Sequence, residues 1–291
     1  MARILGSICT THVPSIGGAI ARNQQRDPYW QPFFDGFPPV HAWLERVQPD
    51  VVVVFYNDHG LNFFLDNLPT FAVGAAERYR NEDEGWGIPA LGDFPGDPEF
   101  SWHVINTLVE SDFDIATCQQ MLVDHAFSLP MKFLWPDKDN HWPVKTIPIC
   151  INTVQHPMPS PRRCFELGRA VGRAIESYPK DLKVVVVGTG GLSHQLDGTR
   201  AGFMNKEFDL MCLDKLISDP EALTRYSPRQ IIELAGSQGV EIVMWIAARA
   251  ALLGEVRELH RNYHIPISNT AAGLQLLENQ PRVREGQRRA G

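Results

Sequence analysis

The chain has 291 residues, of which 44% are hydrophobic and 21% charged, a composition typical of a soluble globular protein. Its net charge of −7 argues against nucleic acid or an anionic membrane as a partner. No run approaches the roughly 18 apolar residues of a membrane helix, and the first residues lack the apolar stretch of a signal peptide. We therefore expect a cytoplasmic protein that binds neither nucleic acid nor membrane.

The first third of the chain contains two predicted strands, each followed by polar residues that include a histidine. Residues 3–10 form the first strand and lead to His12. A helix is predicted over residues 40–48, and the valine run that begins at residue 51 then leads to Asn57-Asp58-His59-Gly60. Such a fully apolar run is typical of a strand buried on both faces, as in a parallel sheet covered by helices. Residues 61–96 have an irregular pattern, which is typical of a functional loop or a contact surface.

The middle of the chain alternates predicted helices and strands. Asp97 as N-cap and Pro98 at the first helical position begin a helix that we expect over residues 98–111. Strands are predicted over residues 113–116 and 144–154, the second interrupted by Pro148, and an amphipathic helix over residues 161–177. Between the two strands, Asp124-His125 precedes a short apolar segment.

The last third begins with a second valine-rich strand, residues 183–188, which leads to Gly190-Gly191-Leu192-Ser193-His194. Ser227-Pro228 begins a helix that Gly236 ends, and a further apolar helix is predicted over residues 240–253. The fold class predicted from this order is α/β: a single domain over residues 1–278, with a mostly parallel central sheet flanked by helices and an active site at the strand carboxyl ends. Residues 279–291 are polar and arginine-rich, and we expect a flexible tail there.

Three histidines share one context, because His12, His59 and His194 each follow a predicted strand and a small or polar turn. A lone histidine at a strand end is more often structural. If the strands are parallel, however, three imidazoles meet at one rim of the sheet, which favours a metal site or a proton-transfer site. The five cysteines are scattered, odd in number and without a CxxC pair, so they indicate neither a disulfide framework nor a zinc cluster.

A metal site of this kind also needs an anion, and Glu241 is the best candidate by position. It is the odd residue at the start of an otherwise apolar helix, where burial of its charge requires a cation or a place at the helix N-terminus. The residue pattern leaves both readings open. Two histidines and one carboxylate describe the facial triad of non-haem Fe(II) oxygenases, although zinc or manganese would accept the same donors. The absence of an HExxH motif argues against the commonest zinc hydrolases.

Several short motifs, in this order, resemble the type II (class III) extradiol ring-cleaving dioxygenases, and among them the catalytic β subunit of protocatechuate 4,5-dioxygenase. The resemblance covers nearly the whole chain. It runs through residues 11–14, 57–59, 83–87, 190–194, 235–241 and 262–273. Each motif is weak alone, and their number and order make the match specific.

The resemblance implies Fe(II) as the cofactor, with His12, His59 and Glu241 as its ligands. It further implies that His194 is the catalytic acid and base, that His125 lies near the substrate hydroxyls, and that Ser268 and Asn269 meet the ring carboxylate. The implied substrates are dioxygen and a carboxylated catechol: protocatechuate, gallate or 3-O-methylgallate. The implied partner is a separate small helical α subunit in an α2β2 assembly.

Two other functions remain as alternatives at this stage. A metal-dependent hydrolase could use the same rim, with zinc bound and His194 activating water; it would consume no oxygen. A non-catalytic binding member of the fold would hold no metal, which fits poorly with the presence of both ligand histidines and the glutamate.

Overall fold

The computed structural model describes residues 1–88 and 91–280. Most of the predicted tail, residues 281–291, therefore lies outside the described residues, and Asn279 belongs to the last strand. The strands are β1 (Arg3–Thr10), β2 (Val51–Tyr56), β3 (Phe71–Gly74), β4 (Arg78–Asn81), β5 (Phe94–Pro95), β6 (Ala116–Cys118), β7 (Leu122–Val123), β8 (Lys145–Ile151), β9 (Lys183–Thr189), β10 (Val256–Ile267) and β11 (Thr270–Asn279). The α-helices are α1 (Pro14–Ala21), α2 (Gln31–Phe34), α3 (Pro38–Val47), α4 (Pro98–Glu110), α5 (His125–Leu134), α6 (Pro161–Ser177), α7 (Lys206–Ser218), α8 (Pro228–Ala235) and α9 (Ile242–Ala251).

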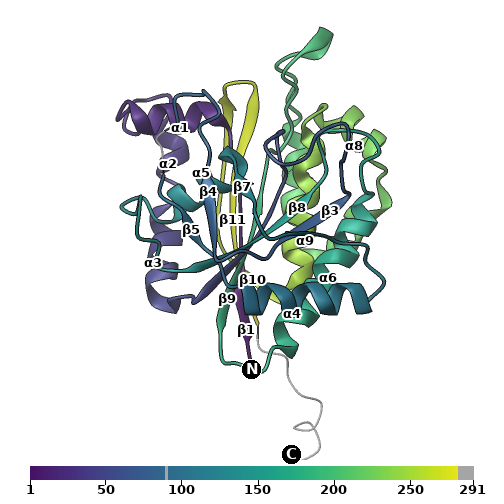
Figure 1. Cartoon of the computed structure of the whole chain (residues 1–291). Helices are drawn as coiled ribbons and strands as arrows, with labels where there is room; N and C mark the ends of the chain where they lie inside the picture. The colour runs from purple at the N-terminus through teal and green to yellow at the C-terminus, as the bar shows by residue number, and fades with distance from the viewer. Residues whose placement is uncertain (89–90, 281–291) are drawn as a thin grey trace, which may run out of the picture.

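Among the described residues, an eight-stranded sheet has the order β10-β11-β1-β9-β2-β8-β3-β6. Its centre, β1-β9-β2-β8, is parallel throughout, and the antiparallel pairings lie toward the edges. Helices cover both faces: α1, α2, α3 and α5 lie on one side, and α4, α6, α8 and α9 on the other (Figure 1). The predicted single α/β domain with a mostly parallel sheet is confirmed.

The valine runs form the base of the site because both of their faces are buried. In β2, Val53 belongs to the apolar core that includes α6 and α9, whereas Val54 belongs to the core that includes α3 and α5. Every residue of β2 is buried, as expected of a strand between two helical layers. The sheet thereby gives the residues that follow its strands a rigid support.

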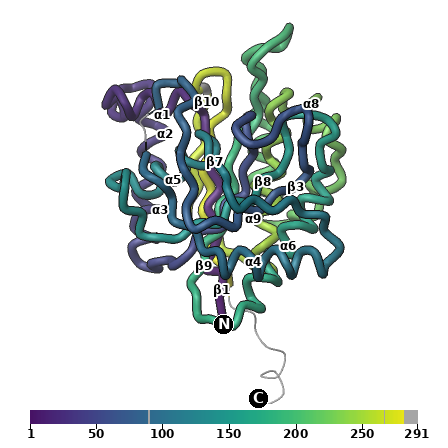
Figure 2. The backbone as a smooth tube through the Cα atoms, viewed as in Figure 1, coloured from purple at the N-terminus to yellow at the C-terminus, as the bar shows by residue number. Residues whose placement is uncertain are grey.

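The C-terminal hairpin of β10 and β11 was not predicted. Strand β11 pairs antiparallel with β1, so the two ends of the described chain lie side by side in the sheet, yellow next to purple in Figure 2. Strand β10 is the edge strand and carries charged residues such as Arg257, Glu258 and Arg261, which conceal the alternation typical of a strand.

The predicted helix starts are confirmed where a capping residue defines them. The Asp97 side chain accepts a hydrogen bond from the Phe100 N–H at 3.2 Å, and Ser227 and Gln230 form a capping box at the start of α8. Helix α6 has the predicted bounds. No helix within residues 1–88 and 91–280 is long and apolar enough to cross a membrane.

Three details of the prediction were wrong. The strand predicted over residues 113–116 lies at Ala116–Cys118, because Phe113 packs into the core instead of starting a strand. Strand β8 continues through Pro148 instead of being interrupted there. Pro148 has no N–H to donate, and the pairing of β8 with β3 ends at the neighbouring residue, Ile149, so no hydrogen bond to β3 is lost. The helix predicted over residues 240–253 begins with a 3-10 turn, Gly239–Glu241, before α9.

Candidate metal centre and active site

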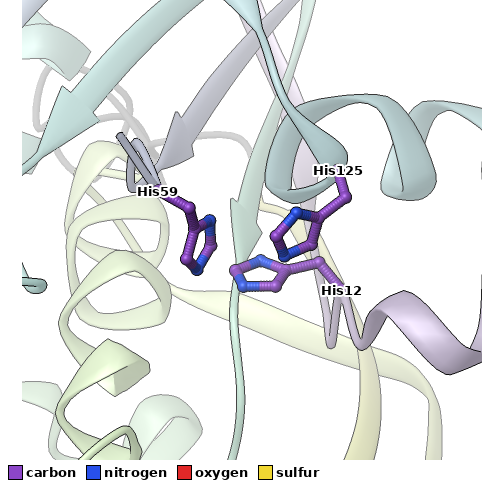
Figure 3. Close-up of side chains that lie close together, drawn as sticks. All are labelled: His12, His59 and His125. Atoms are coloured by element: carbon purple, nitrogen blue, oxygen red, sulfur yellow. The ribbon is translucent and has the colours of Figure 1, made fainter. Parts of the chain in front are cut away.

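The strands that precede three of the candidate histidines are neighbours in the sheet. Strand β9 lies between β1 and β2 and is parallel to both, so their carboxyl ends share one rim, as expected. His12 follows β1 and His59 follows β2, while His125 is the first residue of α5. Potential ligand atoms of His12, His59 and His125 lie within 4.8 Å of one another, and the three rings point toward a common centre (Figure 3).

Glu241 brings a buried carboxylate to this centre. Its Oε2 lies 3.5 Å from His12 Nε2, its Oε1 lies 3.9 Å from His59 Nε2, and the Gly191 N–H donates to Oε2 at 2.7 Å. Burial alone would raise the pKa of Glu241, but His12, His194 and His59 more than offset this effect and hold the pKa well below its usual range. A buried anion between imidazoles is the arrangement that a bound cation stabilises.

Each of the two predicted histidine ligands has a hydrogen-bond partner on Nδ1, which leaves Nε2 directed at Glu241. His59 Nδ1 lies 2.9 Å from Oδ2 of Asp124, a fully buried carboxylate that also accepts the His59 backbone N–H at 2.8 Å. His12 Nδ1 lies 3.2 Å from the Thr189 hydroxyl. Metal-bound histidines characteristically have such a partner on the second ring nitrogen.

The electrostatics of His59 make metal binding and proton release interdependent. Burial lowers the pKa of His59, but the hydrogen bond and charge of Asp124 outweigh burial and raise it to about 9. Because a ligand imidazole must be neutral, a metal ion bound at Nε2 has to displace a proton.

The donor set fits a divalent metal, although the structure offers two ways to complete it. Imidazoles and a carboxylate without a thiolate suit Fe(II), manganese or zinc. The third ligand could be Glu241, as expected from the resemblance, or Nε2 of His125, whose Nδ1 is already bound to Glu84 at 2.9 Å. The anionic state of the buried Glu241 favours the carboxylate, and the ligand roles of all three predicted residues remain predictions.

His194 approaches the same carboxylate from the loop after β9. Its Nε2 lies 3.8 Å from Glu241 Oε2, and its Nδ1 lies 2.9 Å from the Leu192 carbonyl oxygen. Because a carbonyl oxygen only accepts, Nδ1 carries the proton, and Nε2 presents a lone pair to the site. This tautomer has the form required of a general base.

Asp58, whose role the sequence left open, organises the loop after β2 and takes no part in the metal centre. Its carboxylate accepts hydrogen bonds from the N–H groups of Gly60, Leu61, Asn62 and Phe63. The imidazole of His59 pairs with Asp124 instead.

The proposed carboxylate-reading residues, Ser268 and Asn269, are exposed at the turn between β10 and β11. His194 forms a β-bridge with Thr270, which places this turn next to the loop that carries His194. The Ser268 N–H donates to the Tyr29 hydroxyl at 2.8 Å. Their contact with a substrate remains a prediction.

Sequence reasoning missed the residues that support the histidines. Asn57, whose Nδ2 lies 3.1 Å from His59 Nε2 and 3.3 Å from Glu241 Oε1, was noted only as part of the polar turn. Asp124 and Glu84 were likewise quoted within motifs without a role. Their sequence signal was weak, since acidic residues are common in polar turns.

Comparisons with known proteins identify the family. A family model described as the catalytic LigB subunit of aromatic ring-opening dioxygenase matches residues 6–274. A gallate dioxygenase from Pseudomonas putida is 40% identical over 198 residues, which cover 68% of this chain and 58% of that protein. A 2,3-dihydroxyphenylpropionate/2,3-dihydroxicinnamic acid 1,2-dioxygenase from Photorhabdus laumondii is 28% identical over 320 residues, covering 94% of this chain and 96% of that protein.

A solved structure supports the fold alone. The uncharacterized protein JW3007 from Escherichia coli K12 superposes with a TM-score of 0.56 at 13% identity, over 93% of this chain and 99% of that chain. The family model, by contrast, covers both candidate ligand histidines, His194 and Glu241. The resemblance inferred from the motifs is therefore confirmed, and the chain belongs to the family of catalytic LigB subunits of extradiol aromatic ring-opening dioxygenases.

Proposed function

We propose that this chain is a non-haem Fe(II) extradiol dioxygenase that opens the ring of a carboxylated catechol. The observation that carries the proposal is the buried, anionic Glu241, whose carboxylate lies 3.5 Å from His12 Nε2 and 3.9 Å from His59 Nε2. His194 approaches the same carboxylate with a free Nε2. Family membership supports ring opening, while the metal, its ligands and the substrate are parts of the proposal.

Fe(II) would be held by His12, His59 and Glu241 and would supply the redox chemistry that lets a catechol react with dioxygen. The protein holds both reactants in one place, which can contribute on the order of 7 to 11 kcal/mol to lowering the barrier. His194 Nε2 accepts a proton from a substrate hydroxyl and later returns one, while the Leu192 carbonyl keeps the ring oriented. His125 Nε2 accepts a hydrogen bond from a substrate hydroxyl.

Ser268 and Asn269 select for the carboxylate on the ring, and cleavage next to the diol gives a product of the 2-hydroxymuconic semialdehyde type. Protocatechuate, gallate and 3-O-methylgallate differ by one hydroxyl or methoxyl group, which is worth only about 1 to 3 kcal/mol of discrimination in a simple pocket. The similarity to a gallate dioxygenase supports gallate as one of the three substrates to test.

A separate helical α subunit in an α2β2 assembly remains part of the proposal as an accessory to the site. Exposed apolar side chains on the segments after His59 and His194, such as Leu65 at 85% and Leu196 at 55% exposure, offer it a contact surface. The match over 96% of the Photorhabdus laumondii enzyme argues against an α subunit being required.

Anaerobic loading with Fe(II), followed by oxygen uptake with each of the three catechols, tests the proposal. We expect uptake that matches product formation for at least one of them, with and without an added α chain. Protein loaded with Zn(II) serves as the control and should consume no oxygen. Absence of uptake with every catechol, under reducing conditions and with an α chain supplied, would overturn the proposal.

A further inference from the structure

A short loop, residues 82–88, brings a carboxylate to the back of His125. Glu84 Oε2 accepts the His125 backbone N–H at 2.7 Å, and the two carboxylate oxygens lie 2.9 and 3.0 Å from His125 Nδ1. Both side chains are nearly buried, with 5% of His125 and 10% of Glu84 exposed. Glu84 therefore holds the backbone and the ring of His125 at once.

This contact determines which nitrogen His125 presents to the site. Since an ionised carboxylate only accepts hydrogen bonds, Nδ1 carries the proton that it donates to Glu84, and Nε2 is left as the free atom. The His125 ring stacks on His59 with centroids 4.3 Å apart and meets His12 edge-on at 5.4 Å. Without Glu84, either ring nitrogen could face the substrate.

The loop has a backbone that suits this task. Gly85 and Gly87 have φ values of 77° and 68°, which other residues rarely adopt, and Asp83 accepts the Gly85 N–H at 2.8 Å. The Glu82 N–H donates to the Val123 carbonyl at 3.1 Å and ties the loop to the strand before α5. In contrast to Glu84, the Glu82 side chain points outward and pairs with the exposed Arg80 at 2.9 Å.

We propose that Glu84 is the positioning residue of His125: it fixes the ring and its tautomer so that Nε2 faces the substrate oxygens. Within the described residues Glu84 forms no hydrogen bond with a predicted metal ligand, and its hydrogen bonds go to His125. The catalytic consequence rests on the proposed dioxygenase function. The tautomer of His125 can be measured whether or not the protein is a dioxygenase.

The test compares Glu84→Ala, Glu84→Gln and, as the matched control in the same loop, Glu82→Gln. Nitrogen-15 NMR of histidine-labelled, Zn(II)-loaded protein reports the tautomer, with the His125 signals assigned by their loss in His125→Phe. We expect the Nδ1-protonated form in the wild type, Glu82→Gln and Glu84→Gln, because the glutamine carbonyl also accepts. In Glu84→Ala we expect a mixture of tautomers.

The kinetic readout is ring cleavage by the Fe(II)-loaded proteins. We expect kcat/KM to fall about 10- to 100-fold in Glu84→Ala, to recover partly in Glu84→Gln and to stay unchanged in Glu82→Gln. Metal affinity should stay unchanged in Glu82→Gln and should fall less in Glu84→Ala than it would in His125→Ala if His125 were a ligand, because Glu84 acts on the predicted ligand His59 only through its charge, without a hydrogen bond.

A Glu84→Ala variant with the wild-type tautomer and wild-type kcat/KM would overturn the proposal. A large loss of Zn(II) affinity in Glu84→Ala, matched by His125→Ala, would also overturn it, since His125 would then be a metal ligand. If the tautomer changes as expected but no form of the protein, wild type included, cleaves a catechol, then the proposed function fails while the positioning role stands.

Discussion

The site combines two regions of different construction. One consists of His12 and His59, which follow the central parallel strands β1 and β2; β2 is buried along its whole length. The other consists of loops: residues 82–88, where Trp86 is 60% exposed, and the turn at Ser268 and Asn269. The candidate metal ligands belong to the first region, with Glu241 on the turn before the buried helix α9. The second region carries Ser268 and Asn269, proposed to bind the substrate carboxylate, and Glu84, proposed to position His125.

This difference separates two physical requirements. A metal ion needs several donors held within a few tenths of an ångström, which packed strands and helices provide and exposed loops do not. Recognition of a substrate depends on groups that vary between related enzymes, and loops tolerate such variation without loss of the core. Substitutions in the first region should therefore affect metal binding, and substitutions in the second should affect the binding and turnover of the substrate.

The largest effect is expected from Glu241→Ala, which removes the only carboxylate among the predicted ligands. Metal affinity should fall by more than the roughly 10- to 100-fold that is typical of losing an outer partner. Metal analysis after anaerobic loading and desalting measures it, with His125→Ala as the comparison. Full metal content in Glu241→Ala, together with metal loss in His125→Ala, would show that three histidines hold the ion.

His194→Phe should separate chemistry from metal binding. We expect the bound Fe(II) content to be unchanged and turnover to fall by about 10²- to 10⁴-fold, because the phenyl ring removes the Nε2 proposed to accept and return the substrate proton. Iron analysis and oxygen uptake on the same preparation check both parts. Wild-type turnover would remove His194 from the mechanism.

Asp124→Asn tests whether the support behind His59 matters to the metal. We expect metal affinity to fall about 10- to 100-fold, since the amide loses the charge that holds the imidazole. Asparagine still caps α5, where Asp124 accepts the Ala126 N–H at 3.0 Å, so the midpoint temperature of thermal unfolding should change little. Asp97→Asn, at the cap of α4 away from the site, is the matched control in titration calorimetry and thermal unfolding.

Ser268→Ala should have the smallest effect, which should be confined to the binding of the substrate. We expect KM for a carboxylated catechol to rise about fivefold, the value of roughly one net hydrogen bond, with kcat and metal content unchanged. Catechol without the carboxylate should bind both proteins alike, and steady-state kinetics with the two substrates measures the difference. An equal rise for both substrates would mean that Ser268 does not read the carboxylate.

Local patterns in the sequence determined the framework. The valine runs predicted β2 and β9, because a fully apolar strand is stable only between two covered faces, and a mostly apolar segment predicted β1. The caps at Asp97 and Ser227 defined two helix starts, since they satisfy N–H groups only a few residues away. The convergence of His12, His59 and His194 on one rim followed from parallel neighbouring strands.

Only the tertiary structure decided which groups support these histidines. Asp124 meets His59 across 65 positions and Glu84 meets His125 across 41, distances over which sequence periodicity carries no information. The hairpin of β10 and β11 was hidden for a related reason, since an edge strand keeps charged side chains and shows no apolar alternation. Buried periodic segments are determined by local hydrophobicity, whereas contacts between polar groups on loops depend on how the whole chain packs.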